Sequence, residues 1–129
     1  MSERAMEVVL ANYIDAIRRQ DIEAVKERMD PDVVHRGVAD HLLCSDRDEV
    51  LDNVRHRMDR RDAGITRLEL TDAGDKALLY VEGPEFREIG GEALDGNLSV
   101  VFTVRDGKIV EMQDYRSRQE ALSSVGISS

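Results

Sequence analysis

Two apolar runs on either side of Asp106-Gly107 constrain the fold of this chain more than any other feature. Asp-Gly is favoured where a two-residue turn needs positive φ at both central positions, so the pair predicts a β-hairpin. Its strands are expected over residues 97–105 and 108–116. Helical patterns in the first half followed by strands in the second are typical of an α+β domain whose helices cover one face of a curved sheet.

Helical periodicity dominates the first half of the chain. The first predicted helix carries an apolar stripe made of Met6, Val9, Leu10, Tyr13, Ile14 and Ile17. A second helix begins after the capping residue Asp21, and a third follows Asp46, which forms an acidic variant of a capping box with Glu49. Between these two helices, a short β-like segment opens at Val33, and residues 40–45 are expected to form a loop.

After Gly64 the hydrophobic period changes from that of a helix to that of a strand, which predicts a meander. The residues expected in the core or cavity are Met58, Leu68, Leu79, Val81, Phe102, Val104, Val110 and Met112. Residues from Ser117 onward are expected to form a tail. The predicted fold class is therefore α+β, with N-terminal helices packed on a strongly curved, mostly antiparallel sheet in a single domain spanning residues 1–129.

Charge and cysteine content narrow the classes of partner. The 18 basic and 27 acidic side chains give a net charge of −9, which repels nucleic-acid phosphates and anionic lipid head groups, so neither partner is expected. Cys44 is the only cysteine, which excludes an internal disulfide, and the first residues lack a signal-peptide pattern, so a cytoplasmic protein is expected. His35, His41 and Cys44 match no zinc-binding spacing, so no metal or other cofactor is expected.

Strand alternation makes Asp114 a candidate site residue. Residues two apart on a strand share a face, so Asp114 and Arg116 follow Val110 and Met112 inward. The residues expected to point outward are Ile109, Glu111, Gln113 and Tyr115. A carboxylate in apolar surroundings is costly to ionise without a partner, which makes it a candidate general acid or base. The alternative is that Asp114 lies at the mouth of the domain, hydrated or paired with Arg116.

Tyr13 and His35 are the other candidates for chemistry. Tyr13 lies in the apolar stripe, and its hydroxyl needs a hydrogen-bond partner if it is buried, either on a ligand or within the core. His35 shares the face of Val33, so it is either a base that works with Asp114 or a core histidine bonded to a main-chain carbonyl. Cys44 is interpreted as an inert thiol.

Two stretches of the chain carry a resemblance to a known family. Residues 11–37 read ANYIDAIRRQDIEAVKERMDPDVVHRG, and residues 100–115 read VVFTVRDGKIVEMQDY. Their order and content resemble the nuclear transport factor 2-like superfamily, which includes the SnoaL-like polyketide cyclases and the ketosteroid isomerases. The resemblance implies a cone-shaped α+β barrel with a ligand-binding cavity, into which Tyr13, His35 and Asp114 converge from three separate segments.

The resemblance also implies roles for individual residues. A tyrosine at the similar position of the isomerases donates to a developing oxyanion, so Tyr13 is expected to polarise a ligand carbonyl. The two catalytic acids of the isomerases fall at Gly37 and Val100, so ketosteroid isomerase activity is not expected. Besides the three catalytic candidates, the expected ligand-binding residues are Val33, Met58, Val100, Phe102, Met112 and Arg116.

Two functions remain open at this point. The first is binding of a small, largely apolar molecule in the cone, with cofactor-free acid–base chemistry such as isomerisation, cyclisation or hydration. The alternative is a non-catalytic ligand-binding or dimerisation module. Domains of this superfamily commonly pair through the outer sheet face, so the resemblance also implies a homodimer whose interface contains Tyr80, Val101, Ile109 and Tyr115.

Overall fold

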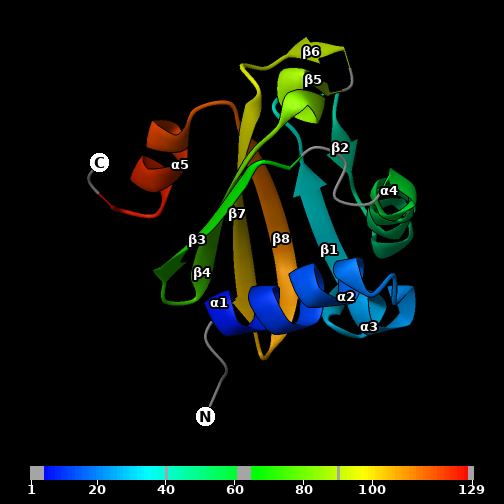
Figure 1. Cartoon of the computed structure of the whole chain (residues 1–129). Coiled ribbons are helices and arrows are strands. Elements are labelled where there is room, and N and C mark those ends of the chain that lie inside the picture. The colour runs from blue at the N-terminus through cyan, green and yellow to red at the C-terminus, as the bar shows by residue number, and fades with distance from the viewer. Residues whose placement is uncertain (1–4, 40, 61–64, 90, 128–129) are drawn as a thin grey trace.

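A six-stranded sheet in the order β2-β1-β8-β7-β4-β3 organises the chain (Figure 1). The computed structural model describes residues 5–39, 41–60, 65–89 and 91–127. The strands of the sheet are β1 (Met29–Arg36), β2 (Leu43–Cys44), β3 (Arg67–Ala73), β4 (Lys76–Glu82), β7 (Asn97–Arg105) and β8 (Lys108–Tyr115). β1 and β8 run parallel, whereas the other neighbouring pairs are antiparallel. A separate ribbon is formed by β5 (Glu88–Ile89) and β6 (Glu92–Ala93).

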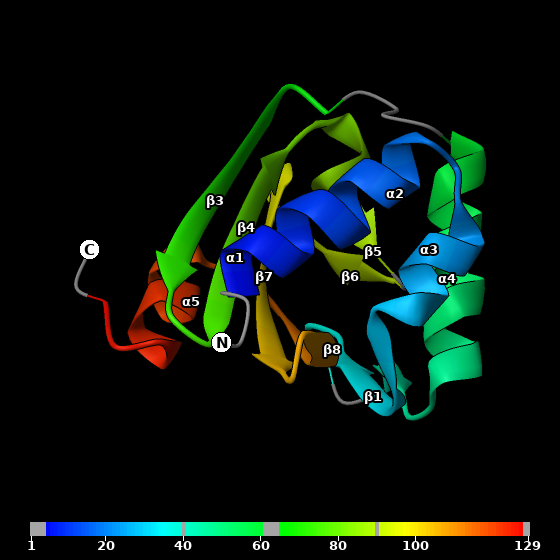
Figure 2. The same cartoon turned by 90° about the horizontal axis from the view of Figure 1, so that it is seen from below.

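Helices cover both faces of this sheet. The N-terminal helices are α1 (Ala5–Val8), the π-helical η1 (Val9–Ile14), α2 (Asp15–Arg18) and α3 (Ile22–Glu27). Together with α4 (Arg47–Arg60) they pack on the inner, concave face, while α5 (Arg118–Ser124) packs on the outer face (Figures 1 and 2). A 3-10 turn, η2 (Pro84–Arg87), leads into the ribbon. None of the described helices is both long and apolar enough to cross a membrane.

Several of these elements begin or turn at the capping and turn residues that the sequence predicts. The Asp21 side chain accepts a hydrogen bond from Ala24 N at the start of α3, and the Asp46 side chain accepts one from Glu49 N at the start of α4. In the hairpin between β7 and β8, Asp106 and Gly107 have φ of 54° and 75°. Positive φ at both positions is the geometry that Asp-Gly favours, so the β7–β8 hairpin is confirmed.

The inner face of the sheet supplies most of the main hydrophobic core. Of the residues expected there, the buried ones are Leu79, Val81, Phe102, Val104 and Met112, and Leu68 packs against them half-buried. Met58 lies in α4, but its side chain is outside the described residues.

A β-bulge changes the inward face of β8 near its start. Thr103 pairs with Glu111 and Val104 pairs with Ile109, so Val110 is an extra residue on β8. Ile109 is consequently fully buried in the main core, whereas Val110 is half-buried on the outer side. The predictions that Val110 faces inward and Ile109 outward are therefore wrong, while those for Met112 and Asp114, which follow the bulge, are confirmed.

The π-helical turn η1 changes which residues of the first helical segment are buried. Its wider i→i+5 turn shifts the helix phase, so that Val8, Val9, Tyr13 and Ile14 are buried. Leu10, predicted to be in the stripe, is 51% exposed.

The residues after Ser117 form a helix and not a tail. The Ser117 side chain accepts a hydrogen bond from Glu120 N and caps α5. Ala121 of α5 then packs on Leu78 and Val101 of the outer sheet face. Tyr80 and Tyr115, which were expected at a dimer interface together with Val101, pack beside α5 of the same chain.

Candidate functional site

A buried hydrogen bond joins His35 of β1 to Asp114 of β8. The two residues are 79 positions apart in the chain, and the His35 Nε2 atom lies 2.8 Å from Asp114 Oδ1. Their side chains are 10% and 5% exposed. Because β1 and β8 are neighbouring parallel strands and both side chains point inward, the sheet itself holds the pair together.

Apolar side chains surround the Asp114 carboxyl group. Asp114 lies opposite Val100 on β7, and Met112 precedes it on the same inward face of β8. Both neighbours are buried. Asp114 is thus one of very few buried polar residues in the described chain, and its partner is His35. The alternative pairing with Arg116 does not occur.

The chemistry of this pair follows from its donors and acceptors. An ionised carboxylate can only accept hydrogen bonds, so it fixes the proton of a neutral His35 on Nε2 and leaves the lone pair on Nδ1. An imidazole oriented in this way can take a proton from a bound molecule and return it. Among the described residues, no group of three or more His, Cys, Asp or Glu side chains is placed to hold a metal ion.

Tyr13 lies in the same apolar interior through its ring. Its ring centroid is 5.1 Å from that of Phe102, and the planes meet at 62°, an edge-to-face contact. Phe102 pairs with Met112, the residue that precedes Asp114 on the inner face of β8. His35 and Asp114 therefore meet on the inner face of the sheet, and Tyr13 packs from η1 onto Phe102 of the same face. Val33, Val100, Phe102 and Met112 are buried in the same core.

Arg116, a predicted ligand-binding residue, is hydrogen-bonded to the β5–β6 ribbon. Its guanidinium donates to Ala93 O at 2.7 Å and to Glu92 Oε1 at 2.7 Å. It therefore anchors the ribbon strand β6 to the end of β8, two residues beyond Asp114.

There is no room for a side chain at Gly37, the position where the resemblance places a catalytic acid of the isomerases. A Cβ added at Gly37 would lie 2.4 Å from Leu42 Cβ and 2.8 Å from Leu42 O, which is closer than real Cβ atoms approach. Gly37 N also donates a hydrogen bond to Leu42 O. The chain thus folds back on itself at Gly37, which leaves no room for a side chain there.

Cys44 lies beside His35, a placement that the sequence did not predict. It lies on the two-residue strand β2, within the segment expected as a loop, and it pairs directly with His35. Opposite residues of an antiparallel pair share a face, so the half-buried thiol lies on the side of His35. A strand of two residues has no alternation to recognise, so no sequence signal for this placement was present.

Burial raises the pKa of the Cys44 thiol, and the carboxylates of Glu49, Asp114 and Asp46 raise it further. Since the thiolate is the reactive form, iodoacetamide should alkylate Cys44 slowly at neutral pH. The alkylation rate of Cys44 should rise at a higher pH than the alkylation rate of a peptide with the same local sequence. Mass spectrometry of adduct formation across neutral to alkaline pH measures both rates, and a half-maximal rate at or below the pH of the peptide would contradict this prediction.

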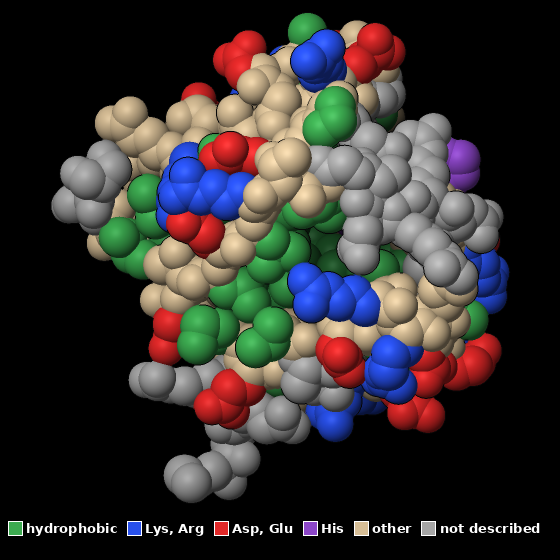
Figure 3. Space-filling view, viewed as in Figure 1, with side chains coloured by type: hydrophobic (Ala, Val, Ile, Leu, Met, Phe, Trp, Pro, Cys, Tyr) green, Lys and Arg blue, Asp and Glu red, His purple; other side chains and the backbone are tan. Residues whose placement is uncertain are grey.

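A hollow opens on the inner side of the sheet in the view of Figure 3, and its visible floor consists largely of hydrophobic side chains. A comparison with protein families agrees with this fold: a family model described as the SnoaL-like domain matches residues 10–112. The chain belongs to the SnoaL-like domain family. The nuclear transport factor 2-like resemblance is thereby confirmed, and the matched residues of this SnoaL-like domain include Tyr13, His35 and Cys44.

Solved structures share the fold of this SnoaL-like domain at low sequence identity. A nuclear transport factor 2-like protein of unknown function from Cytophaga hutchinsonii has a TM-score of 0.61 and 10% identity, with 94% of this chain and 97% of that chain covered. A putative polyketide cyclase from Sinorhizobium meliloti has a TM-score of 0.58 and 24% identity, with 82% and 92% covered. A protein of unknown function with a cystatin-like fold from Xanthomonas campestris has a TM-score of 0.61 and 18% identity, with 95% and 98% covered. A comparison with curated proteins found no match.

Proposed function

We propose that this SnoaL-like domain binds a small, largely apolar molecule on the inner face of its sheet and that His35 and Asp114 perform acid–base chemistry on it. The observation that carries the proposal is the 2.8 Å hydrogen bond between two buried polar side chains among apolar neighbours. Replacing a buried polar or ionic pair by apolar residues of similar volume is often neutral or stabilising. A fold does not in general need such a pair, which supports a role in function for this one.

In the proposed chemistry, His35 is the base and Asp114 positions it. His35 Nδ1 takes a proton from a carbon next to a carbonyl group of the bound molecule, while Asp114 accepts the Nε2 hydrogen bond. Tyr13 packs from η1 onto Phe102 of this face, and in the proposed chemistry its hydroxyl donates to the oxyanion that forms on the carbonyl. Return of the proton to another carbon completes an isomerisation. In a cyclisation, the carbanion attacks a second carbonyl of the same molecule, and the alkoxide that forms takes the proton back from His35. The putative polyketide cyclase with the same fold is consistent with the second outcome.

A non-catalytic binding module is the second candidate. Two observations favour it: Gly37 has no room for the acid of the isomerases, and Val100 supplies no second acid opposite Asp114. In this case His35 and Asp114 would hydrogen-bond a polar group of the ligand without transferring a proton.

Two probes separate these candidates. The neutral dye N-phenyl-1-naphthylamine reports an apolar cavity by its fluorescence, and 5-nitrobenzisoxazole opens its ring when a base removes its ring proton. We expect the wild type to bind the dye and to open the ring faster than free imidazole at equal concentration. His35→Gln and Asp114→Asn should retain dye binding and lose the ring opening.

A matched control lies on the outward side of the same strand. Glu111→Gln removes a carboxylate of β8 that faces away from the pair, and it should change neither probe. Dye binding without ring opening in the wild type would favour the binding module. Absence of dye binding would contradict a ligand cavity altogether.

A homodimer through the outer sheet face stays a prediction. A partner on that face would meet α5 as well as the strands, because α5 covers Leu78 and Val101 there. Analytical ultracentrifugation at micromolar concentration is expected to detect a dimer. A monomer at every concentration, in the full chain and in a variant truncated before α5, would contradict the prediction.

A further inference from the structure

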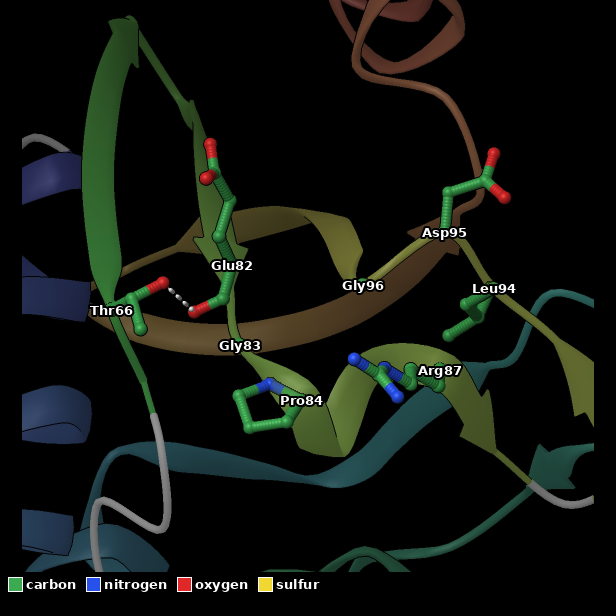
Figure 4. Close-up of a pocket in the computed structure, with 8 residues that line it drawn as sticks. All are labelled: Thr66, Glu82, Gly83, Pro84, Arg87, Leu94, Asp95 and Gly96. Carbon is green, nitrogen blue, oxygen red and sulfur yellow. Dashed lines mark hydrogen bonds between the residues drawn. The ribbon is translucent and has the colours of Figure 1, made fainter.

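A polar groove lies at the end of the sheet where β4 ends and β7 begins (Figure 4). Its volume is about 480 Å³, within the range of small-molecule sites. The turn η2 and the segment between β6 and β7 form its walls, with Pro84 and Arg87 on one side and Leu94 and Gly96 on the other. Backbone hydrogen bonds from Gly83 N to Gly96 O and from Gly96 N to Phe86 O hold the two walls together, so the groove is built from ordered backbone.

One cationic and two acidic side chains line this groove, and their orientations decide which charge a bound molecule meets. Arg87 is the one basic residue among those that line the groove, and its guanidinium lies between Pro84 and Leu94 (Figure 4). The carboxylates of Glu82 and Asp95 also belong to the lining but point away from Arg87 (Figure 4).

Glu82 is already occupied by other partners. Its Oε2 atom accepts a hydrogen bond from the Tyr80 hydroxyl at 2.6 Å and lies 3.4 Å from Arg67 Nη1. The hydrogen bond to Glu82 is also the main reason that the pKa of Tyr80 is raised. Because Glu82 is held on the outer side by these residues, it does not neutralise Arg87.

The groove and the His35–Asp114 pair lie at the same end of the sheet. Arg116, two residues beyond Asp114, donates to Ala93 O at 2.7 Å, and the next residue along the ribbon, Leu94, lines the groove. Leu94 is also part of the main hydrophobic core. Leu94 therefore lies between the inner face of the sheet and the groove that contains Arg87.

We propose that this groove binds an oxyanion carried by the ligand, such as a carboxylate, with Arg87 as its specificity-determining residue. The inference rests on the proposed function and narrows it, since the ligand becomes an apolar molecule with one anionic end. A guanidinium recognises an oxyanion through two parallel N–H donors, which a lysine or a neutral side chain cannot reproduce. In a chain of net charge −9, an anion is repelled by most of the surface, so a local cation decides where it binds.

Two dyes that differ in one anionic group test the proposal. 8-Anilinonaphthalene-1-sulfonate has the skeleton of N-phenyl-1-naphthylamine with an added sulfonate. We expect Arg87→Gln to weaken binding of the sulfonate dye by about three- to tenfold and to leave the neutral dye unchanged. Added salt should weaken binding of the sulfonate dye more in the wild type than in the Arg87→Gln variant.

Arg105→Gln is the matched control, because Arg105 is an exposed arginine that lines a different groove, beside Asp30 and Asp32. The proposal would be overturned if both variants weakened binding of the sulfonate dye equally. It would also be overturned if Arg87→Gln weakened binding of the two dyes equally. No effect of Arg87→Gln on either dye would overturn it while the proposed function stands. Failure of the wild type to bind either dye would overturn the proposed function as well.

Discussion

Replacing Phe102 by alanine should lower the free energy of unfolding by about 3–5 kcal/mol. Phe102 is only 1% exposed and lies on β7, the strand between β8 and β4. Its register partners Met112 and Ala77 are also buried. The substitution removes the ring, its edge-to-face contact with Tyr13, and the packing of both neighbouring strands. Urea denaturation of the wild type and the variant measures the difference.

The neighbouring residue supplies the control. Thr103 precedes the bulge and faces the outer side of the sheet, so Thr103→Ala should cost less than about 1 kcal/mol. Phe102→Leu keeps most of the buried volume and should cost less than the alanine variant. A loss below about 1.5 kcal/mol for Phe102→Ala would mean that the ring is poorly packed, contrary to a closed core around it.

Local signals account for the parts of the fold that could be predicted from the sequence. The Asp106-Gly107 turn needs only two residues with positive φ, and both have it. The inward side of Met112 and Asp114 follows from strand alternation, and so does that of His35. The meeting of His35 and Asp114 required more, namely that β1 and β8 are neighbours, and this came from the family resemblance.

One-residue shifts account for two of the errors. The bulge at Val110 and the π-helical turn at Leu10 each change the phase of a periodic pattern by one position. Neither leaves a signal in the pattern itself, because each shift exchanges two adjacent apolar residues, Ile109 and Val110 in β8 and Val9 and Leu10 in the helix. The choice between Ile109 and Val110 is made by packing in the assembled core, where Ile109 is fully buried.

The C-terminal helix was missed for a different reason. α5 has seven residues, too few to be stable alone, and it depends on docking Ala121 against the outer sheet face. A signal was nevertheless present, since Ser117 and Glu120 have the spacing of a capping box, and Ser117 does cap the helix.

The second large effect is expected at the His35–Asp114 pair, where the single substitutions should cost more than the double one. Asp114→Leu leaves the buried His35 Nε2 without its hydrogen-bond partner, and His35→Phe leaves the buried Asp114 carboxyl group without its partner. Each single variant should lose about 2–4 kcal/mol of unfolding free energy. The double variant replaces both polar groups by apolar ones, so it should recover to within about 1 kcal/mol of the wild type or exceed it.

This double-mutant cycle distinguishes a functional pair from a structural one. The losses expected above imply a coupling energy of about 3 kcal/mol or more, at or above the top of the range usual for residues in contact. Independent positions add to within about 0.5 kcal/mol, so additive losses would contradict the buried hydrogen bond. The rate of 5-nitrobenzisoxazole ring opening should be measured on the same four proteins, namely the wild type, the two single variants and the double variant. A double variant that is as stable as the wild type but has lost the ring opening would mean that the chain keeps a polar pair in its core for its chemistry and not for its fold. A double variant far less stable than the wild type would instead identify His35 and Asp114 as part of the structural core.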